Sequence, residues 1–214
     1  MVKAVLFDMD GVLAFTEGFY NRRRVRFLQE AGVDVDPNFD GTGSYDGEIW
    51  ERLIPKDAAL RERLRRAYRT YSDEHPTPWA EVANPQCHMV FSALRDNGIG
   101  VAICSSSYRT LIEEFVDQVG VRGLVDFIIS GEECSAYKPD PDIYLRAMDA
   151  MGIEPHEALV VEDSPLGIEA GVAAGSLTCA LMPPKGVELD QSQAHLRIGK
   201  LSEIVDLARK GSLR

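Results

Sequence analysis

Two aspartates, Asp8 and Asp10, stand two residues apart directly after the apolar run from Val2 to Phe7. The run is typical of a buried strand in a parallel sheet, and alternation along a strand sends residues i and i+2 to the same side. Two carboxylates at one strand end can divide the work of nucleophile, metal ligand and acid/base. Because their charges repel, a divalent cation is the usual companion of such a pair. Taken alone, the pair also fits a loop aspartate that caps a helix.

Three further groups of polar side chains follow apolar runs later in the chain. They are Ser105 after the run 100–104, Lys138 in the loop after the run 126–130, and Glu162 with Asp163 at the end of the run 158–163. In open parallel sheets, ligands bind beyond the carboxyl ends of the strands. We therefore expect an acid pair, a hydroxyl, a cation and a second acid pair to share one edge of a sheet.

This set of side chains suits phosphoryl transfer. Both the transferred group and a carboxylate nucleophile are anionic, so a cation and hydrogen-bond donors must offset their repulsion. Magnesium is suited to this task because it keeps oxygen ligands from one or two carboxylates and from substrate phosphate. Asp8 and Asp163 would be its side-chain ligands, with Glu162 nearby, and Lys138 would neutralise the phosphate charge.

The remaining two side chains have complementary roles in such a reaction. Ser105 precedes a turn into a predicted helix, so its hydroxyl and nearby backbone N–H groups can bind phosphate oxygens. Asp10 would protonate the leaving oxygen and then activate water against the acyl phosphate.

The elements that must position these residues alternate along the second part of the chain. Apolar runs and helical periodicity predict helices over 86–97, 111–119, 143–151, 165–174 and around 201–208, and strands over 100–104, 126–130, 158–163 and 177–182. Alternation of strands and helices produces a parallel sheet with right-handed crossovers. The expected fold class is α/β, with a parallel sheet flanked by helices.

Between the first strand and this alternating part lies a segment with no convincing strand. Apolar positions at helical spacing predict one helix around 20–31 and another around 60–71, separated by a polar, glycine-rich piece at 40–44. We therefore expect a core domain of residues 1–14 and 84–214, and a helical domain of residues 15–83. An insertion after the first strand would lie over the carboxyl end of the sheet, which makes it a candidate lid.

Composition limits the partners and the compartment. The 214 residues are 45% hydrophobic, enough for one domain with a smaller insertion, and the net charge of −11 argues against nucleic acid and anionic membranes. The four cysteines form no C-x-x-C pair, which favours free thiols in a reducing compartment. No signal peptide and no apolar stretch of about 18 residues is present. We expect a soluble cytoplasmic protein, a monomer or a weak homodimer.

The four motifs occur in a familiar order. They are Asp8-Met9-Asp10-Gly11-Val12, Ser105, Lys138-Pro139-Asp140-Pro141-Asp142 and Glu162-Asp163-Ser164. Over nearly the whole chain, the sequence resembles the haloacid dehalogenase superfamily, in its subgroup of β-phosphoglucomutase-like phosphatases. The resemblance implies a Rossmann-like core with a small helical cap after the first strand. It also implies that Asp8 is the nucleophile, that Asp10 is the general acid/base, and that Asp8, Asp163 and the Asp10 backbone carbonyl bind Mg²⁺. An aspartate at position 10 is typical of the family's phosphatases and phosphomutases.

The helical domain departs from the family pattern at positions that decide the substrate. Phe15 replaces the second aspartate of D-G-V-x-x-D-[ST], and Tyr20 stands where the sugar-phosphate mutase carries a cap histidine. No arginine near residues 44–46 matches the one with which the mutase binds a second phosphate. We therefore favour hydrolysis of a small phosphorylated metabolite, with Thr16, Tyr20 and Ser106 as substrate contacts. The alternatives are a sugar-phosphate mutase of the β-phosphoglucomutase type and a catalytically silent binding protein of the same fold.

Two features of the helical domain can be interpreted either as structural or as functional. Five aromatic residues can pack the helices or line a substrate pocket: Phe15, Phe19, Tyr20, Tyr45 and Trp50. Arginines 22–24 and the five arginines between residues 61 and 69 can form a solvated helix face or attract an anionic substrate. We favour packing for the aromatic residues and a solvated face for the arginines.

Overall fold

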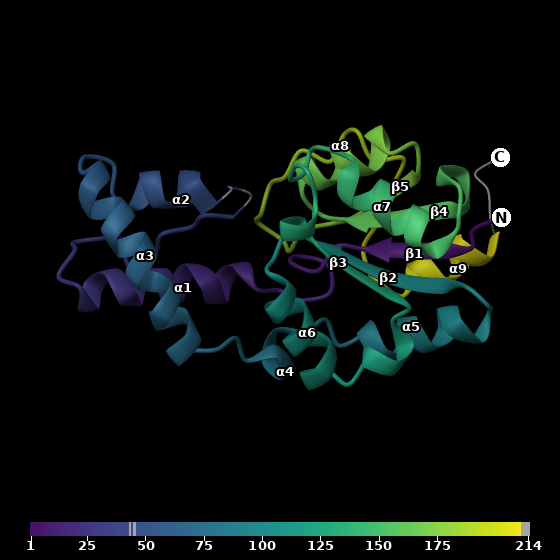
Figure 1. Cartoon of the computed structure of the whole chain (residues 1–214), viewed down its shortest axis with the longest axis horizontal. Helices are drawn as coiled ribbons and strands as arrows, with labels where there is room; N and C mark the ends of the chain where they lie inside the picture. Colours follow the sequence, from purple (N-terminus) through teal and green to yellow (C-terminus); the bar gives the residue numbers. More distant parts are fainter. Residues whose placement is uncertain (43, 45, 211–214) are drawn as a thin grey trace. The chain divides into compact units, whose positions relative to one another are not determined.

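The computed structural model of the chain describes residues 1–42, 44 and 46–210. The chain forms two compact units (Figure 1), one comprising Met1–Phe15 with Trp79–Arg214 and the other Thr16–Pro78. We call them the sheet unit and the helical unit. The second division falls before the position expected at 83/84. The reason is that the buried Trp79 ring packs against Phe115 of the sheet unit, with 5.6 Å between ring centroids.

Six parallel strands form the sheet, in the order β3-β2-β1-β4-β5-β6. The strands are β1 (Ala4–Phe7), β2 (Gly100–Ser105), β3 (Phe127–Ser130), β4 (Ala158–Glu162), β5 (Leu177–Leu181) and β6 (Leu196–Ile198). The expected α/β class with a parallel sheet is therefore confirmed. The strand order reverses between β1 and β4, and this switch point is where open α/β sheets bind their ligands.

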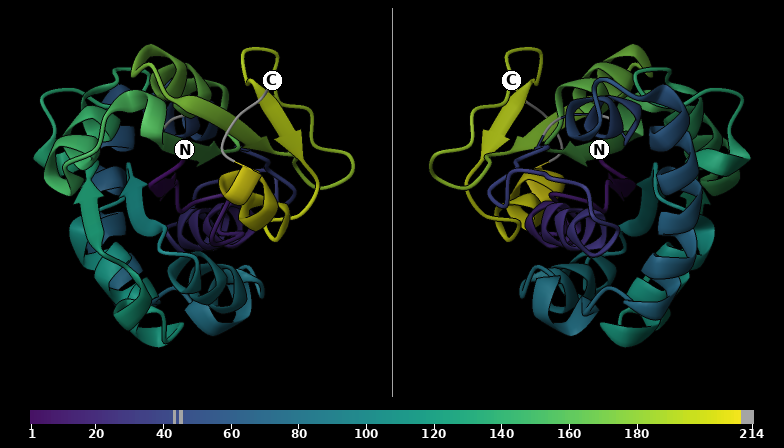
Figure 2. Two further views of the ribbon diagram at one scale, coloured as in Figure 1. Left: turned by 90° about the vertical axis from the view of Figure 1, so that its right-hand side faces the viewer. Right: turned by 90° about the vertical axis from the view of Figure 1, so that its left-hand side faces the viewer.

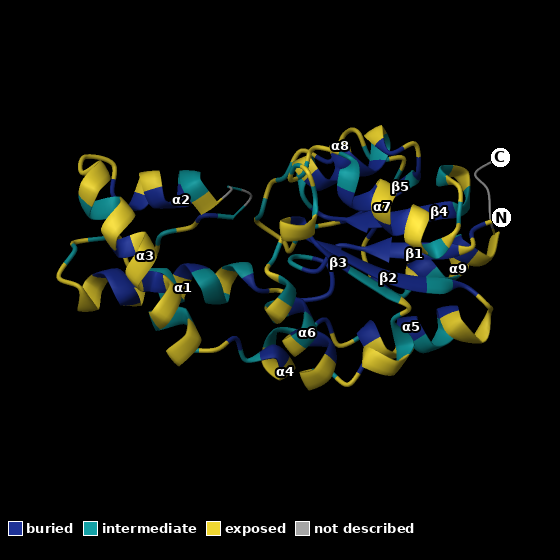
Figure 3. Cartoon of the chain, viewed as in Figure 1, coloured by how far each residue is buried: buried dark blue, intermediate teal, exposed yellow. Residues whose placement is uncertain are grey.

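Helices cover both faces of this sheet (Figures 1 and 2). In the sheet unit they are α4 (Trp79–Val82), α5 (Cys87–Asp96), α6 (Arg109–Gln118), α7 (Asp142–Met151), α8 (Pro165–Ala173) and α9 (Glu203–Lys210), with the 3₁₀ turns η1 (Arg122–Leu124), η2 (Gly131–Glu133) and η3 (Pro155–Glu157). One face carries α5, α6 and α9, and the other carries α7 and α8. Figure 3 shows the buried strands between helices whose outer sides are exposed.

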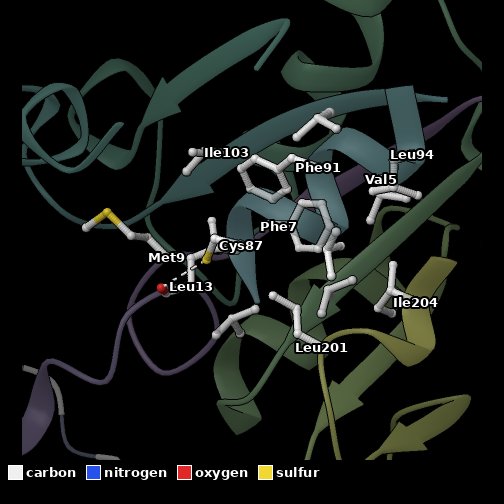
Figure 4. Close-up of a cluster of buried hydrophobic side chains, with 14 of the residues drawn as sticks. Val5, Phe7, Met9, Leu13, Cys87, Phe91, Leu94, Ile103, Leu201 and Ile204 are labelled. Carbon is white, nitrogen blue, oxygen red and sulfur yellow. Dashed lines mark hydrogen bonds between the residues drawn. The ribbon is translucent and has the colours of Figure 1, made fainter. Parts of the chain in front are cut away.

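The larger apolar cluster of the sheet unit lies under α5, α6 and α9 (Figure 4). In it the rings of Phe7 and Phe91 lie 5.1 Å apart, and the Cys87 thiol donates a hydrogen bond to the Leu13 carbonyl at 3.4 Å. Burial raises the pKa of the Cys87 thiol to about 12, so the thiol stays protonated. This cluster fixes β1 and therefore the strand end that carries Asp8.

The helical unit contains α1 (Glu17–Glu30), α2 (Asp46–Leu53) and α3 (Ala58–Glu74). Three aromatic rings pack together among the aliphatic side chains of its core: the Tyr68 ring lies 5.4 Å from the Phe27 ring and 5.4 Å from the Trp50 ring. Trp50 is therefore a packing residue, as favoured from the sequence. The Asp57 carboxylate accepts a hydrogen bond from the Leu60 N–H at 2.8 Å and caps α3.

Besides the short 3₁₀ turns, two α-helices and one strand were not expected from the sequence: α2, α4 and β6. The helix α2 has eight residues and includes Gly47, so its apolar positions are too few to establish a helical period. The strand β6 has three residues with Arg197 at its centre, and pairing with β5 is what makes it a strand. Among the described helices, none has the length and hydropathy to cross a membrane.

Candidate active site

The register of the central strands brings three chain segments to one point. Phe7 of β1 is aligned with Ile103 of β2 and with Val161 of β4. The residues that follow these three positions are Asp8, Cys104 and Glu162. The Lys138 ammonium contacts all three. It donates to Asp8 Oδ1 at 2.5 Å, to Glu162 Oε1 at 2.6 Å and to the Cys104 carbonyl at 3.0 Å. One buried cation thus joins the ends of β1, β2 and β4.

Glu162 is fully buried and accepts hydrogen bonds at both carboxylate oxygens. Besides Lys138, the Tyr144 hydroxyl donates to Oε1 at 2.7 Å. Oε2 accepts from the Asp163 N–H at 3.2 Å and from the Ser164 hydroxyl at 3.2 Å. A Cβ at Gly167 would lie 1.8 Å from Glu162 Oε1, so only glycine leaves room for this carboxylate. These contacts orient Glu162 toward Lys138.

Three carboxylates lie close together at this point, and the Lys138 ammonium contacts two of them, Asp8 and Glu162. Ligand oxygens of Asp8, Glu162 and Asp163 lie within 4.8 Å of one another, and all three residues are buried. Burial raises the pKa of Asp8 well above its usual value; Lys138 lowers it in part, while Glu162 and Asp10 raise it further. The surplus of negative charge and the all-oxygen donor set fit a divalent cation.

Lys138 keeps its charge in spite of its burial. Burial lowers the pKa of an ammonium, but the neighbouring carboxylates of Asp8 and Glu162 outweigh this effect, so the pKa is raised overall. A permanently charged donor is therefore available beside Asp8.

Asp163 is placed by two residues that are remote in sequence. Gly11 has φ +89°, and a Cβ there would lie 2.0 Å from Asp163 Oδ2, so Gly11 meets both a backbone and a space requirement. The buried Gln191 side chain donates to the carbonyls of Asp163 and Leu181, both at 2.8 Å. Gln191 lies in an irregular loop, and no sequence signal singled it out.

A serine not chosen from the sequence contacts Asp10. The Ser107 hydroxyl donates to Asp10 Oδ2 at 2.6 Å, and its backbone N–H donates to Ser105 Oγ at 3.0 Å. Ser105 is buried at the end of β2, whereas Ser106 is exposed. The i, i+2 spacing of Ser105 and Ser107 was the available signal, because it matches the spacing of Asp8 and Asp10 on the neighbouring strand.

The structure thus brings most of the predicted residues together. Asp8, Lys138, Glu162 and Asp163 form one cluster, and Ser107 links Asp10 to Ser105. Thr16 and Tyr20 belong to the helical unit, where Thr16 is buried and the Tyr20 ring lies 5.1 Å from the Arg23 guanidinium carbon. Their roles as substrate contacts remain predictions, as does that of Ser106. Tyr45 lies outside the described residues.

The arginines of the helical unit are of two kinds. Arg63 and Arg66 are exposed, as expected for a solvated face. Arg23 is half-buried and joins α1 to the end of α3: its Nε donates to the Tyr68 hydroxyl at 2.9 Å, and a terminal nitrogen donates to the His75 carbonyl at 2.8 Å. For Arg23, the interpretation as a solvated residue was therefore wrong, because its guanidinium donates hydrogen bonds to another part of the helical unit instead of facing water.

Comparison with known proteins establishes the family. The family model described as haloacid dehalogenase-like hydrolase matches residues 2–175, a range that includes all four motifs. The chain belongs to this family. Similar proteins include a provisionally named pyrophosphatase from Clostridium perfringens, 29% identical over 98% of this chain and 99% of its own length. Another is a phosphoglycolate phosphatase from Aquifex aeolicus, 27% identical over 96% of each chain.

Solved structures support the fold of this family member. A β-phosphoglucomutase from Clostridium difficile superposes with a TM-score of 0.76 at 20% identity, covering 99% of this chain and 97% of the other. At this identity the likeness concerns the fold alone. The expected superfamily and Rossmann-like fold are confirmed, and the named relatives confirm the expected class of enzyme, a phosphatase of this superfamily.

Proposed function

We propose that the protein is a magnesium-dependent phosphatase that hydrolyses a small phosphate monoester through an aspartyl phosphate on Asp8. The observation that carries the proposal is the buried contact between Asp8 and Lys138 inside a surplus of carboxylates. A carboxylate at the switch point of the sheet can reach a bound phosphorus, and the ammonium offsets the repulsion between the two anions. The named relatives act on phosphorylated compounds, which supports the same class of substrate here.

The acidic cluster supplies the ligands of the metal. The carboxylates of Asp8 and Asp163, together with the Asp10 backbone carbonyl, would hold Mg²⁺, which offsets negative charge on the phosphate and on the nucleophile. Glu162 is near enough to take part, but both of its oxygens already accept hydrogen bonds. Its main task in this proposal is to orient Lys138.

Hydrolysis then proceeds in two displacements at phosphorus. An Asp8 oxygen forms a bond to phosphorus as the bond to the ester oxygen breaks, and Asp10 gives its proton to that leaving oxygen. Water next attacks the phosphorus of the aspartyl phosphate, and Asp10 takes a proton from it while the Asp8 carboxylate leaves. Lys138 stays charged throughout and stabilises the oxygens that gain charge.

Substrate binding involves both units in this proposal. Ser105 and Ser106 follow β2 and provide donors for the phosphate oxygens. The helical unit acts as the cap that selects the rest of the metabolite, with Thr16 and Tyr20 as its contacts. No arginine stands at positions 44–46 in the sequence, but the side chains of Arg52, Arg24 and Arg65 reach Ser44 or Asp46. The substrate panel below therefore decides whether the substrate carries one phosphate group or two.

A substrate panel tests the proposal. Release of inorganic phosphate is measured with Mg²⁺ on phosphoglycolate, sugar phosphates, nucleotides, pyrophosphate and p-nitrophenyl phosphate, with Asp8→Asn as the control. We expect release that the variant loses on the order of 10⁴-fold or more, as for other covalent nucleophiles. Phosphate release that persists in Asp8→Asn would refute the nucleophile. Isomerisation of a sugar phosphate without release would identify a mutase, and binding without turnover would identify a silent binding protein.

A further inference from the structure

Ser107 is held at three separate atoms. Its hydroxyl donates to Asp10 Oδ2 at 2.6 Å, its N–H donates to Ser105 Oγ at 3.0 Å, and its carbonyl accepts from Ser130 Oγ at 2.7 Å. Ser130 is buried at the end of β3, and its hydroxyl also accepts the Glu132 N–H at 3.2 Å. The backbone of Ser107 is therefore fixed between the ends of β2 and β3, independently of its own side chain.

We propose that Ser107 is a positioning residue for the general acid/base: its hydroxyl sets the direction in which the Asp10 carboxylate points. The inference rests on the proposed function of Asp10. The bond joins residues 97 positions apart in sequence. The O–H···O distance of 2.6 Å lies at the short end of the ordinary range for such bonds. One residue thereby links Asp10 to Ser105, so the proton donor and the expected phosphate contact are aligned by the same short loop.

The geometry predicts a selective effect of losing this hydroxyl. In Ser107→Ala both backbone hydrogen bonds remain possible, so the loop keeps its place while Asp10 loses the hydroxyl donor of Ser107. An alkoxide leaving group is a strong base and needs a proton from a well-placed acid, whereas p-nitrophenolate is a weak base that can leave without one. Positioning of Asp10 therefore matters for alkyl phosphates and hardly for p-nitrophenyl phosphate.

The kinetic experiment compares two substrates in four proteins. For the best alkyl phosphate of the panel and for p-nitrophenyl phosphate, kcat/KM is measured in the unsubstituted protein, Ser107→Ala, Ser107→Thr and the exposed-serine control Ser192→Ala. We expect Ser107→Ala to lose about ten-fold or more with the alkyl ester and about two-fold or less with the aryl ester. Ser107→Thr keeps a hydroxyl and should restore most of the loss. Equal losses on the two substrates, or no loss on either, would overturn the proposal.

A structural measurement keeps this inference separate from the proposed function. Crystal structures with Mg²⁺ should show the Asp10 carboxylate turned away from its original direction in Ser107→Ala and restored in Ser107→Thr. An unchanged Asp10 in Ser107→Ala would overturn the positioning role whatever the activity. If the unsubstituted protein releases no phosphate, the proposed function fails, and the direction of Asp10 still decides whether Ser107 positions it.

Discussion

The sheet unit and the helical unit differ in charge and in the way they are packed. The helical unit, residues 16–78, has 11 lysines and arginines against 12 acidic residues, whereas the sheet unit has 12 against 22. Nearly all of the net charge of −11 therefore belongs to the unit with the candidate phosphate site. A phosphate can bind there only because local positive charge opposes the overall sign, which places Lys138 and a divalent cation at the centre of function.

Packing differs in a corresponding way. The sheet unit buries aliphatic strands on both faces, so strand register fixes polar side chains at the strand ends to within hydrogen-bonding distance. The core of the helical unit mixes aliphatic side chains with a group of aromatic rings, and half-buried Arg23 connects its helices. The sheet unit thus places its reacting groups through strand register, whereas the helical unit is held by side-chain contacts between helices.

The largest loss of activity and stability is expected when the buried cation Lys138 is replaced, compared with replacement of an exposed cation. Lys138→Met removes the ammonium that donates to Asp8 Oδ1 and Glu162 Oε1 and leaves these two buried carboxylates without their cation. We expect phosphate release to fall by about 10³-fold or more and unfolding to become easier by about 3–5 kcal/mol. Arg66→Met on the exposed face of α3 is the matched control and should change neither. Similar losses in both variants would contradict the contrast between the units.

Removal of the metal should change the activity and the stability of the sheet unit and leave the helical unit unchanged. EDTA is expected to stop phosphate release reversibly, and Mg²⁺ to raise the melting temperature by relieving repulsion among Asp8, Glu162 and Asp163. Hydrogen exchange should show the added protection at the ends of β1 and β4 and not in α1–α3. Metal-independent turnover would refute the magnesium requirement, and Asp163→Asn should abolish the Mg²⁺-induced rise in melting temperature.

Truncation of one large aromatic residue in each unit tests whether they unfold independently. Trp50→Ala and Phe91→Ala each empty a buried site, at a cost of about 3–5 kcal/mol. We expect hydrogen exchange to speed up within residues 16–78 for Trp50→Ala and within the sheet unit for Phe91→Ala. A uniform acceleration over the whole chain in both variants would show a single cooperative unit instead.

A smaller effect is expected at Gln191. Gln191→Leu leaves the carbonyls of Asp163 and Leu181 without their shared donor, at a cost of about 1–3 kcal/mol. Because Asp163 loses its backbone anchor, calorimetry should show weaker Mg²⁺ binding. The exposed neighbour Gln193→Leu serves as the control. Unchanged metal affinity in Gln191→Leu would mean that Gly11 and the strand end suffice to place Asp163.

The mildest test uses cysteines, all four of which belong to the sheet unit. Burial raises the pKa of the Cys87 and Cys179 thiols to about 12, so at pH 8 they stay protonated in the folded protein. A thiol reagent should label the half-buried Cys134 first, and the three buried cysteines at a rate that follows unfolding of the sheet unit. Trp50→Ala should leave that slow rate unchanged; fast labelling of Cys87 in the native protein would contradict its burial.

The motifs were readable from the sequence because each is local. One apolar strand is followed by Asp8 and Asp10, and another ends at Glu162 and Asp163. In each case a few consecutive residues are enough to predict both a buried strand and polar side chains at its end. The same holds for the long helices, whose periodicity spans several turns. Family, fold class and the residues of the central cluster could therefore be predicted before any contact was known.

Tertiary structure alone decided which partners hold those residues. The chain offered three adjacent serines, and only the packing of the β2 and β3 ends singled out Ser107 as the donor to Asp10. Tyr144 and Gln191 likewise contact Glu162 and Asp163 across loops, and β6 exists because β5 lies beside it. A hydrogen bond between residues far apart in sequence depends on which strands and loops become neighbours, and that is decided only when the sheet assembles.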